Sequence, residues 1–155
     1  MGTNTGTTIS RRRAETVWTG SALEGSGTTS FRSSGVIADQ PVSLTSRTQE
    51  KPEKQTDPEE LIAAAHATCY AMAFSNVLTS DGTPPEQLDV KSTVSLDKVE
   101  DGFAISSSKL VVTGRVPGLS QEQFEDAAHR ADQGCPVSNA LRGNLEITVE
   151  ATLES

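Results

Sequence analysis

Residues 57–78 have the sequence DPEELIAAAHATCYAMAFSNVL, and the rest of the chain is organised around this segment. Asp57 is a good N-cap, Pro58 suits the first helical position, and Glu60 completes a capping box. The residues that follow are nearly all helix-compatible and apolar or small, with no clean polar stripe. We therefore expect a long helix that is buried on most sides, with Cys69 in its middle.

Alternation of apolar and polar residues predicts strands after this helix. Leu88–Leu96 and Phe103–Val116 form a candidate hairpin around an Asp-Gly turn, although the apolar register slips near Ser108 and indicates a bulge. The cleanest alternation in the chain predicts a last strand over Leu145–Leu153. Capping and turn residues between these strands predict two helices, Ser120–Asp132 and Pro136–Arg142.

Shorter segments before the helix also resemble strands. Residues 1–13 have little to bury and are expected to be a disordered tail. Gly and Ser clusters then separate three short strands, at Ala14–Thr19, Gly27–Ser33 and Pro41–Arg47. The order β-β-β-α-β-β-α-α-β favours an α+β architecture with an antiparallel sheet, formed by one domain over residues 14–155.

Charge and hydropathy exclude several classes of partner. The formal net charge is −8, which disfavours binding to nucleic acid and to anionic membrane surfaces. No window is expected to reach the length of a membrane span. The basic run Arg11-Arg12-Arg13 is not followed by the apolar segment of about 7–15 residues that an export signal needs. We therefore expect a cytoplasmic protein.

The chain has two cysteines, Cys69 and Cys135. In a reducing compartment a permanent structural disulfide is not expected, so the open alternatives are buried core residues, metal ligands and redox groups. Cys69 alone would be interpreted as a core residue. Cys135 lies between Gly134 and Pro136 at the start of a helix, where unpaired N–H groups favour a thiolate. This position favours a redox role.

A zinc site is the minority interpretation. His66, Cys69, His129 and Cys135 supply two nitrogens and two sulfurs, but His129 and Cys135 are six residues apart across a helix break and no short Cys-x-x-Cys knuckle is present. No metal is expected. His66 lies one turn before Cys69, but a lone histidine on a buried helix is more often a hydrogen-bonded core residue, so it receives no catalytic role.

A reactive thiol needs a nearby cation to lower its pKa from about 8.5. Arginine is the apt partner, and the residues leave the choice open among Arg32, Arg47, Arg115, Arg130 and Arg142. Only Arg47 has a position that favours it, at the end of the strand before the loop that leads to the Cys69 helix.

Two segments resemble the motifs of one family. Residues 57–73 resemble the first-cysteine motif of the OsmC/Ohr family of organic hydroperoxide reductases, and residues 134–141, GCPVSNAL, resemble its second. With residues 94–105 between them, the likeness covers roughly Trp18 to Leu153. His66 and the Cys-Pro-Val-Ser wording are more similar to the OsmC branch than to the Ohr branch.

The resemblance implies a peroxidase that needs no cofactor. Cys69 matches the peroxidatic cysteine, Cys135 the resolving cysteine, and Arg47 and Glu59 the family's arginine and glutamate. The resemblance also implies a Cys69–Cys135 disulfide, reduction by a dithiol such as a lipoyl group carried on a protein, and an intertwined homodimer of α+β subunits around a long central helix. A buried helix that is apolar on nearly all sides agrees with a homodimer.

Helix geometry qualifies the role of Glu59. Ten residues of one helix separate Glu59 from Cys69, which places them roughly 15 Å apart. We therefore expect Glu59 to orient Arg47, or to act across the dimer interface, rather than to contact sulfur.

The expected reaction is reduction of a hydroperoxide by Cys69, followed by disulfide closure with Cys135. Nearby Met72 and Phe74 favour organic hydroperoxides over hydrogen peroxide, although the same residues suit a core. The rival interpretation is a non-catalytic, small-molecule-binding member of the same fold.

Overall fold

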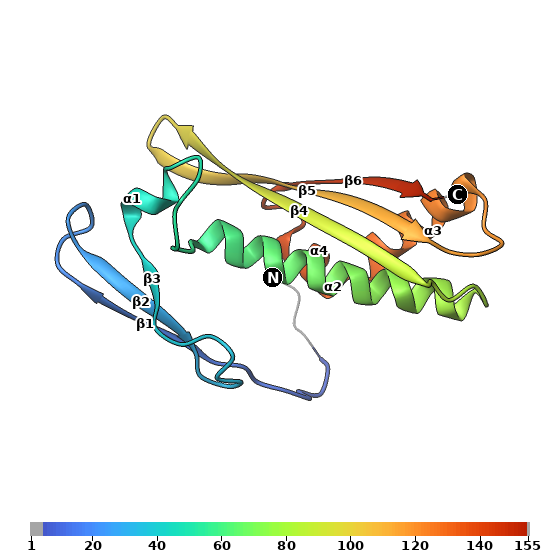
Figure 1. Ribbon diagram of the computed structural model, residues 1–155, viewed down its shortest axis with the longest axis horizontal. Helices are drawn as coiled ribbons and strands as arrows, with labels where there is room; N and C mark the ends of the chain where they lie inside the picture. Colours follow the sequence, from blue (N-terminus) through green and yellow to red (C-terminus); the bar gives the residue numbers. More distant parts are fainter. Residues whose placement is uncertain (1–4, 155) are drawn as a thin grey trace. The chain divides into compact units, whose positions relative to one another are not determined.

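The computed structural model describes residues 5–154, and the chain divides between Asp57 and Pro58 into two compact units. The N-terminal unit is built on an antiparallel sheet in the order β1-β2-β3 (Figure 1). Its strands are β1 (Ala14–Thr19), β2 (Ser26–Phe31) and β3 (Gln40–Val42), which confirms the three short strands.

The third strand is shorter than the sequence indicates. We expected a strand over Pro41–Arg47, but β3 ends at Val42 and α1 (Leu44–Arg47) follows. The reason is a cap: the Ser43 side chain accepts a hydrogen bond from the Ser46 N–H at 3.1 Å and starts a helical turn.

The expected disordered tail falls partly outside the described residues, which begin at residue 5. Residues 5–13 are exposed and form no helix or strand. At their end, the Arg13 carbonyl accepts hydrogen bonds from the N–H groups of Arg32 and Ser33, at 2.9 and 3.2 Å. Disorder in this segment stays a prediction, as does the single domain.

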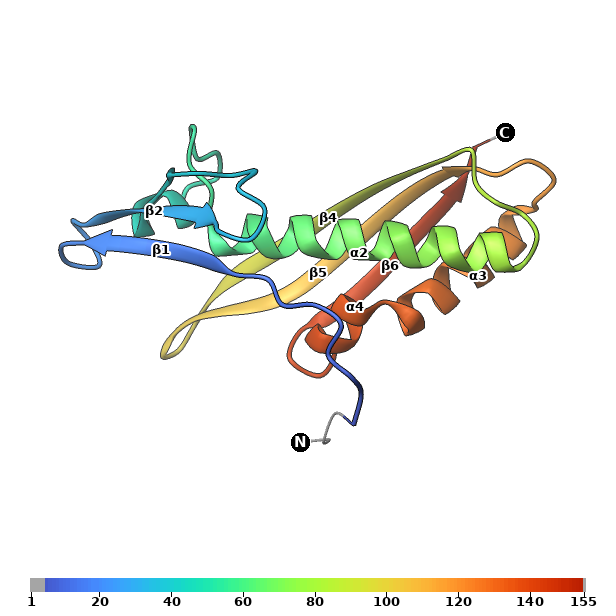
Figure 2. The ribbon, with the colours of Figure 1, turned by 90° about the horizontal axis from the view of Figure 1, so that it is seen from below.

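The C-terminal unit packs helices on one face of a second three-stranded sheet (Figures 1 and 2). Its order in space is β4-β5-β6. Helix α2 runs along β4, and α3 lies beside α2 and against β6. The elements are α2 (Pro58–Ser80), β4 (Gln87–Val99), β5 (Gly102–Arg115), α3 (Gln121–Gly134), α4 (Pro136–Leu141) and β6 (Glu146–Leu153).

This sheet is mixed rather than antiparallel throughout. Strands β4 and β5 form the expected antiparallel hairpin, but β6 pairs parallel to β5. The connection explains the difference, because residues 116–145 carry α3 and α4 across the sheet, and such a crossover returns the chain in the same direction. The expectation of a purely antiparallel sheet is therefore wrong, whereas the α+β class is confirmed.

The bulge lies close to where the sequence indicated it. Ser95 pairs with Ser107 and Leu96 with Ile105, so Ser106 is the extra residue, two positions before Ser108. Beyond the bulge, Ser108, Leu110 and Val112 all point into the core.

Helix α2 buries one face. Tyr70, Phe74 and Leu78 are fully buried at four-residue spacing, together with His66 one turn earlier, whereas Met72 is 68% exposed. Within the single chain, α3 and the sheet cover one side of α2, so burial on most sides stays a prediction that requires a second subunit.

Helix α2 is long and apolar enough to cross a membrane. The expectation that no segment reaches the length of a membrane span is therefore wrong. The core helix of a globular protein meets the same criterion. One face of α2, with Tyr70, Phe74 and Leu78, packs in the hydrophobic core with Phe124 of α3.

Candidate active site

The two cysteines meet where α4 faces the middle of α2. Cys69 lies on α2, half-buried, and Cys135 is fully buried at the junction between α3 and α4. Cys135 is both the C-cap of α3 and the N-cap of α4, with Pro136 in the first turn of α4. Both cysteines are free thiols in this structure. The fold thus brings together two residues that are far apart in the sequence.

Backbone N–H groups of the first turn of α4 are directed at both sulfurs. The Ser138 N–H donates to the Sγ of Cys135 at 3.4 Å. The Val137 N–H donates to the sulfur of Cys69 and favours its thiolate. The helix start therefore supplies donors to sulfur, as the position of Cys135 before Pro136 indicated.

The pKa of Cys69 is nevertheless raised. Burial is the largest cause, and the Cys135 thiol adds to it through a hydrogen bond and through charge repulsion, against the lowering effect of Val137. The direction is opposite to what a thiol that attacks peroxide requires. Ionisation of Cys69 therefore calls for a further stabilising group.

A buried histidine connects three elements next to the thiols. His66 is fully buried, and its Nδ1 is hydrogen-bonded to Oγ of Ser108 on β5 at 2.6 Å. Its Nε2 is hydrogen-bonded to Oγ of Ser138 on α4 at 2.8 Å. Ser108 in turn bonds Oγ of Ser92 on β4 at 3.1 Å. His66 thus has the hydrogen-bonded core environment expected for it, with partners that sequence analysis did not identify.

Two further contacts brace the turn that holds Cys135. Arg142 donates from Nη2 to the carbonyl oxygen and to Oδ2 of Asp132, at 3.2 and 3.1 Å, and so ties the end of α4 to the end of α3. The Asn139 side chain donates to the Gln133 carbonyl at 3.0 Å. Sequence analysis missed this bracing, because nothing in the spacing of Asp132 and Arg142 distinguishes it from an ordinary surface pair.

The residues next to Cys69 on α2 serve the core. Tyr70 donates from its hydroxyl to the Ala128 carbonyl of α3 at 2.8 Å, and burial, Asp132 and Cys135 together raise its pKa. Phe74 packs against Phe124 with ring centroids 4.8 Å apart. Of the two interpretations given for Phe74, a preference for organic hydroperoxides or a place in the core, the structure supports the core.

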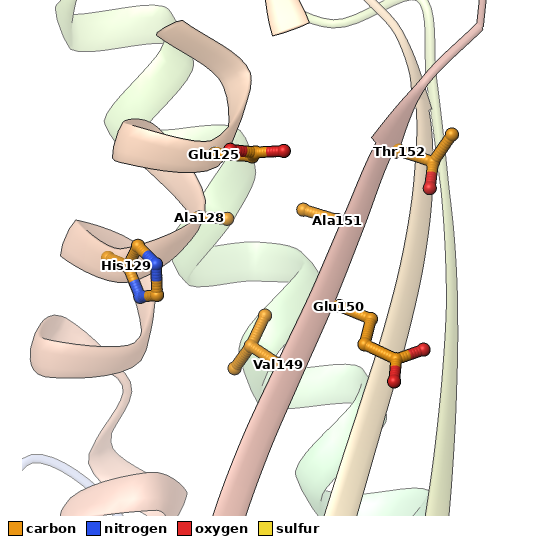
Figure 3. Close-up of a pocket in the computed structure, with 7 residues that line it drawn as sticks. All are labelled: Glu125, Ala128, His129, Val149, Glu150, Ala151 and Thr152. Carbon is orange, nitrogen blue, oxygen red and sulfur yellow. The ribbon is translucent and has the colours of Figure 1, made fainter. Parts of the chain in front are cut away.

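The structure separates the residues of the zinc alternative. Both ring nitrogens of His66 bind serine hydroxyls. His129 lies on α3 and lines a cavity of about 280 Å³ between α3 and β6, together with Glu125 and Val149 (Figure 3). Cys135 is not among the residues that line it. Within residues 5–154, no group of three or more His, Cys, Asp or Glu side chains is placed to hold a metal ion.

Several of the candidate arginines form salt bridges with carboxylates. The pairs are Arg32 with Glu15, Arg115 with Glu154, Arg130 with Asp81 and Asp126, and Arg142 with Asp132. Arg47 ends α1 in the N-terminal unit, and Glu59 lies in the first turn of α2 in the C-terminal unit. Their roles at the thiol stay predictions.

Comparison with known proteins identifies the family. The OsmC-like protein model matches residues 51–150. The chain is 41% identical to Peroxiredoxin OsmC of Escherichia coli strain K12 over 144 residues, 93% of this chain and 97% of that one. It is 33% identical over 95 residues to the organic hydroperoxide resistance protein of Xanthomonas axonopodis pv. citri, 61% of this chain and 65% of that one.

A solved structure agrees with these sequence relatives. An organic hydroperoxide resistance protein OsmC from Legionella pneumophila superposes with a TM-score of 0.67 at 25% identity, over 94% of this chain and 99% of that one. The likeness therefore extends to the fold. Together, the match over residues 51–150 and the 41% identity across nearly the whole chain show that this protein belongs to the OsmC-like protein family.

Proposed function

We propose that this protein is a cysteine-based peroxidase that reduces organic hydroperoxides to alcohols. One observation carries the proposal: the free thiols of Cys69 and Cys135 lie close enough at the start of α4 for Cys135 to raise the pKa of Cys69. Two thiols in contact can exchange two electrons with a peroxide by forming a disulfide. The relatives named peroxiredoxin and organic hydroperoxide resistance protein support the same chemistry.

In the first step the Cys69 thiolate attacks one peroxide oxygen. A sulfur–oxygen bond forms, the O–O bond breaks, and the leaving alkoxide takes up a proton to become the alcohol. Sulfur loses two electrons and becomes a sulfenic acid. The Val137 N–H, which donates to this sulfur, stabilises the thiolate before attack.

In the second step the Cys135 sulfur attacks the sulfenic acid. The S–S bond forms, the S–O bond breaks, and hydroxide leaves as water after taking a proton. A dithiol then reduces the disulfide and restores both thiols, and a lipoyl group carried on a protein is the reductant we propose. The cytoplasm, whose thiol pools are reducing, is the compartment that suits this cycle.

Arg47 and Glu59 complete the proposed site. Burial and Cys135 raise the pKa of Cys69, so a fixed cation is needed to ionise it. Arg47 is the arginine that the family resemblance assigns to this role. Glu59 is about 15 Å along α2 from Cys69 at the helical rise of ~1.5 Å per residue, so its proposed role is to orient Arg47.

Thiol counting tests this proposal against the rival binding function. One equivalent of cumene hydroperoxide added to the reduced protein should consume both thiols and yield one equivalent of cumyl alcohol. Hydrogen peroxide at the same concentration should react more slowly. If both thiols remain free while the hydroperoxide persists, the protein is not a peroxidase and the small-molecule-binding alternative gains support.

We also propose that the protein is a homodimer in which the uncovered side of α2 packs against a second copy. Met72 is 68% exposed on this helix, and Thr68 and Ala65 are exposed one and two turns earlier. Burial of such an apolar side is the main driving force for association. Light scattering should give twice the mass of one chain, and Met72→Glu should shift the protein toward monomer. A fully active monomer would contradict the dimer.

A further inference from the structure

His66 is a completely buried polar residue that the reaction described above does not use. Its imidazole lies between β5 and α4. The Oγ of Ser108 is 2.6 Å from Nδ1, and the Oγ of Ser138 is 2.8 Å from Nε2. Both distances are those of well-formed hydrogen bonds. A buried imidazole needs a hydrogen-bond partner on each nitrogen, and here the two partners lie on two different elements, β5 and α4.

The hydrogen bonds around this ring can all be satisfied at once. In neutral imidazole one nitrogen donates and the other accepts, so one of Ser108 and Ser138 accepts from the ring and the other donates to it. The remaining bond of the chain links Ser108 to Ser92, at 3.1 Å between the two Oγ atoms. The chain therefore runs without interruption from β4 through β5 and α2 to α4. Fully satisfied buried networks of this kind fix the relative positions of the elements they join.

The network ends at the sulfur of Cys135. Ser138 uses its side chain to bind His66, and its backbone N–H donates to Sγ of Cys135 at 3.4 Å. Cys69 stands three residues after His66, one turn further along α2. One turn of α2 thus carries both the thiol that Cys135 must reach and the ring that holds the first turn of α4.

We propose that His66 is a positioning residue for disulfide closure, which holds α4 through Ser138 so that the Cys135 sulfur is aimed at Cys69. This inference rests on the proposed peroxidase function. In the step concerned, the Cys135 thiolate attacks the Cys69 sulfenic acid, the S–S bond forms, the S–O bond breaks, and the hydroxide that leaves takes a proton from solvent to become water. His66 exchanges no electrons and touches neither the peroxide nor the reacting sulfurs.

The first test separates the two half-reactions in the full chain. Stopped-flow measurements follow peroxide consumption, which reports sulfenic acid formation, and quenched alkylation follows disulfide closure. Ser138→Ala should slow closure by about tenfold, the rate effect of losing one well-placed interaction of ~1.4 kcal/mol, and leave peroxide consumption within about twofold. Dimedone should label more of Cys69 in this variant than in the wild type.

Ser107→Ala is the matched control. Ser107 is the neighbour of Ser108 on β5, it is only half-buried, and it has no part in the His66 network. This variant should close its disulfide at the wild-type rate. If Ser138→Ala also closes at the wild-type rate, or if both half-reactions slow equally in it, the positioning role is wrong.

A pair of substitutions at His66 supplies the second test. Gln places an amide near the position of Nε2 and can keep the contact with Ser138, whereas Asn places its amide near Nδ1 and can keep the contact with Ser108. The proposal predicts faster closure in His66→Gln than in His66→Asn. The melting temperature of each variant should be measured as well. If the rates of disulfide closure differ between the two variants only as their melting temperatures do, His66 has a merely structural role and the proposal is overturned.

Different results would contradict the peroxidase function and the positioning role of His66. A wild-type protein that forms no sulfenic acid and no disulfide with hydroperoxide would remove the proposed peroxidase function itself. A wild type that closes the disulfide normally, with Ser138→Ala and both His66 variants closing at the same rate, would leave the peroxidase function standing and remove only the role of His66.

Discussion

Cys69 on α2 and Cys135 at the start of α4 place their thiols close enough for one to affect the ionisation of the other. Burial is the largest cause of the raised pKa of Cys69, and the second sulfur raises that pKa further by its hydrogen bond and by charge repulsion. The residue that is proposed to complete the reaction therefore also disfavours ionisation of the first thiol.

Removal of the second thiol should make the first one more acidic. In Cys135→Ala the hydrogen bond and the charge repulsion are lost, while the Val137 N–H that favours the thiolate belongs to the backbone and remains. The pH profile of Cys69 alkylation by iodoacetamide should move to lower pH than in the wild type. A profile that moves to higher pH, with the helical signal in circular dichroism unchanged, would contradict this relationship.

Loss of the proposed cation should act in the opposite direction. An opposite charge within ~4–6 Å lowers a pKa by about 1–3 units, so Arg47→Ala should raise the pKa of Cys69 and slow peroxide consumption. Arg115→Ala serves as the matched control, because Arg115 pairs with Glu154 at 3.6 Å at the far end of β5. Equal alkylation profiles for wild type and Arg47→Ala would show that Arg47 does not interact with the thiol.

Stability should fall in mild acid because of His66. Burial lowers the pKa of His66, Asp132 opposes this effect, and Arg142 adds to it. A histidine in the unfolded chain has a pKa of about 6.5. Below that pH the unfolded chain binds a proton at this residue and the folded chain does not, so the free energy of unfolding decreases as the pH falls.

Urea unfolding at several pH values between about 7.5 and 5.5 measures this effect. The free energy of unfolding of His66→Gln should depend less steeply on pH than that of the wild type. His129→Gln is the matched control on the surface of α3. The assignment to His66 is wrong if His129→Gln, and not His66→Gln, reduces the dependence on pH.

Close packing at Gly114 gives a stability prediction that is independent of the thiols. A Cβ at this position of β5 would collide with the ring of Phe124 and approach Leu88 Cδ2 at 3.0 Å. Gly114→Ala should therefore cost about 1–3 kcal/mol of unfolding free energy, the usual effect of overpacking a core. Gly134→Ala, where the added methyl meets no atom within 4 Å, should cost much less in the same denaturant titration. Equal costs would refute the packing argument.

Local sequence signals predicted most elements because each signal acts within a few residues. Ser120 caps α3 through the Gln123 N–H at 3.2 Å, and Pro58 lies at the start of α2, as their sequence positions indicated. The strand expected up to Arg47 failed for a local reason as well, since Ser43 acts as an N-cap there. The parallel pairing of β6 could not be read from its alternation, because alternation is the same in either direction.

The site was predictable only in part. The Gly-Cys-Pro segment indicated that Cys135 begins a helix, and α4 begins there. His66 shares its four-residue spacing with the buried Tyr70, Phe74 and Leu78, which is a signal that it faces the core. Its partners Ser108 and Ser138 lie 42 and 72 residues away along the chain, so only the tertiary structure identifies them.

The proposed reaction makes its most direct prediction about one covalent bond. Reduced protein should be treated with one equivalent of cumene hydroperoxide, blocked with iodoacetamide, digested, and analysed by mass spectrometry. We expect a Cys69–Cys135 disulfide in the wild type, a dimedone-reactive Cys69 without that disulfide in Cys135→Ser, and no oxidation above background in Cys69→Ser. Intact thiols at both positions of the wild type, or oxidation of Cys135 in Cys69→Ser at the wild-type rate, would contradict the account.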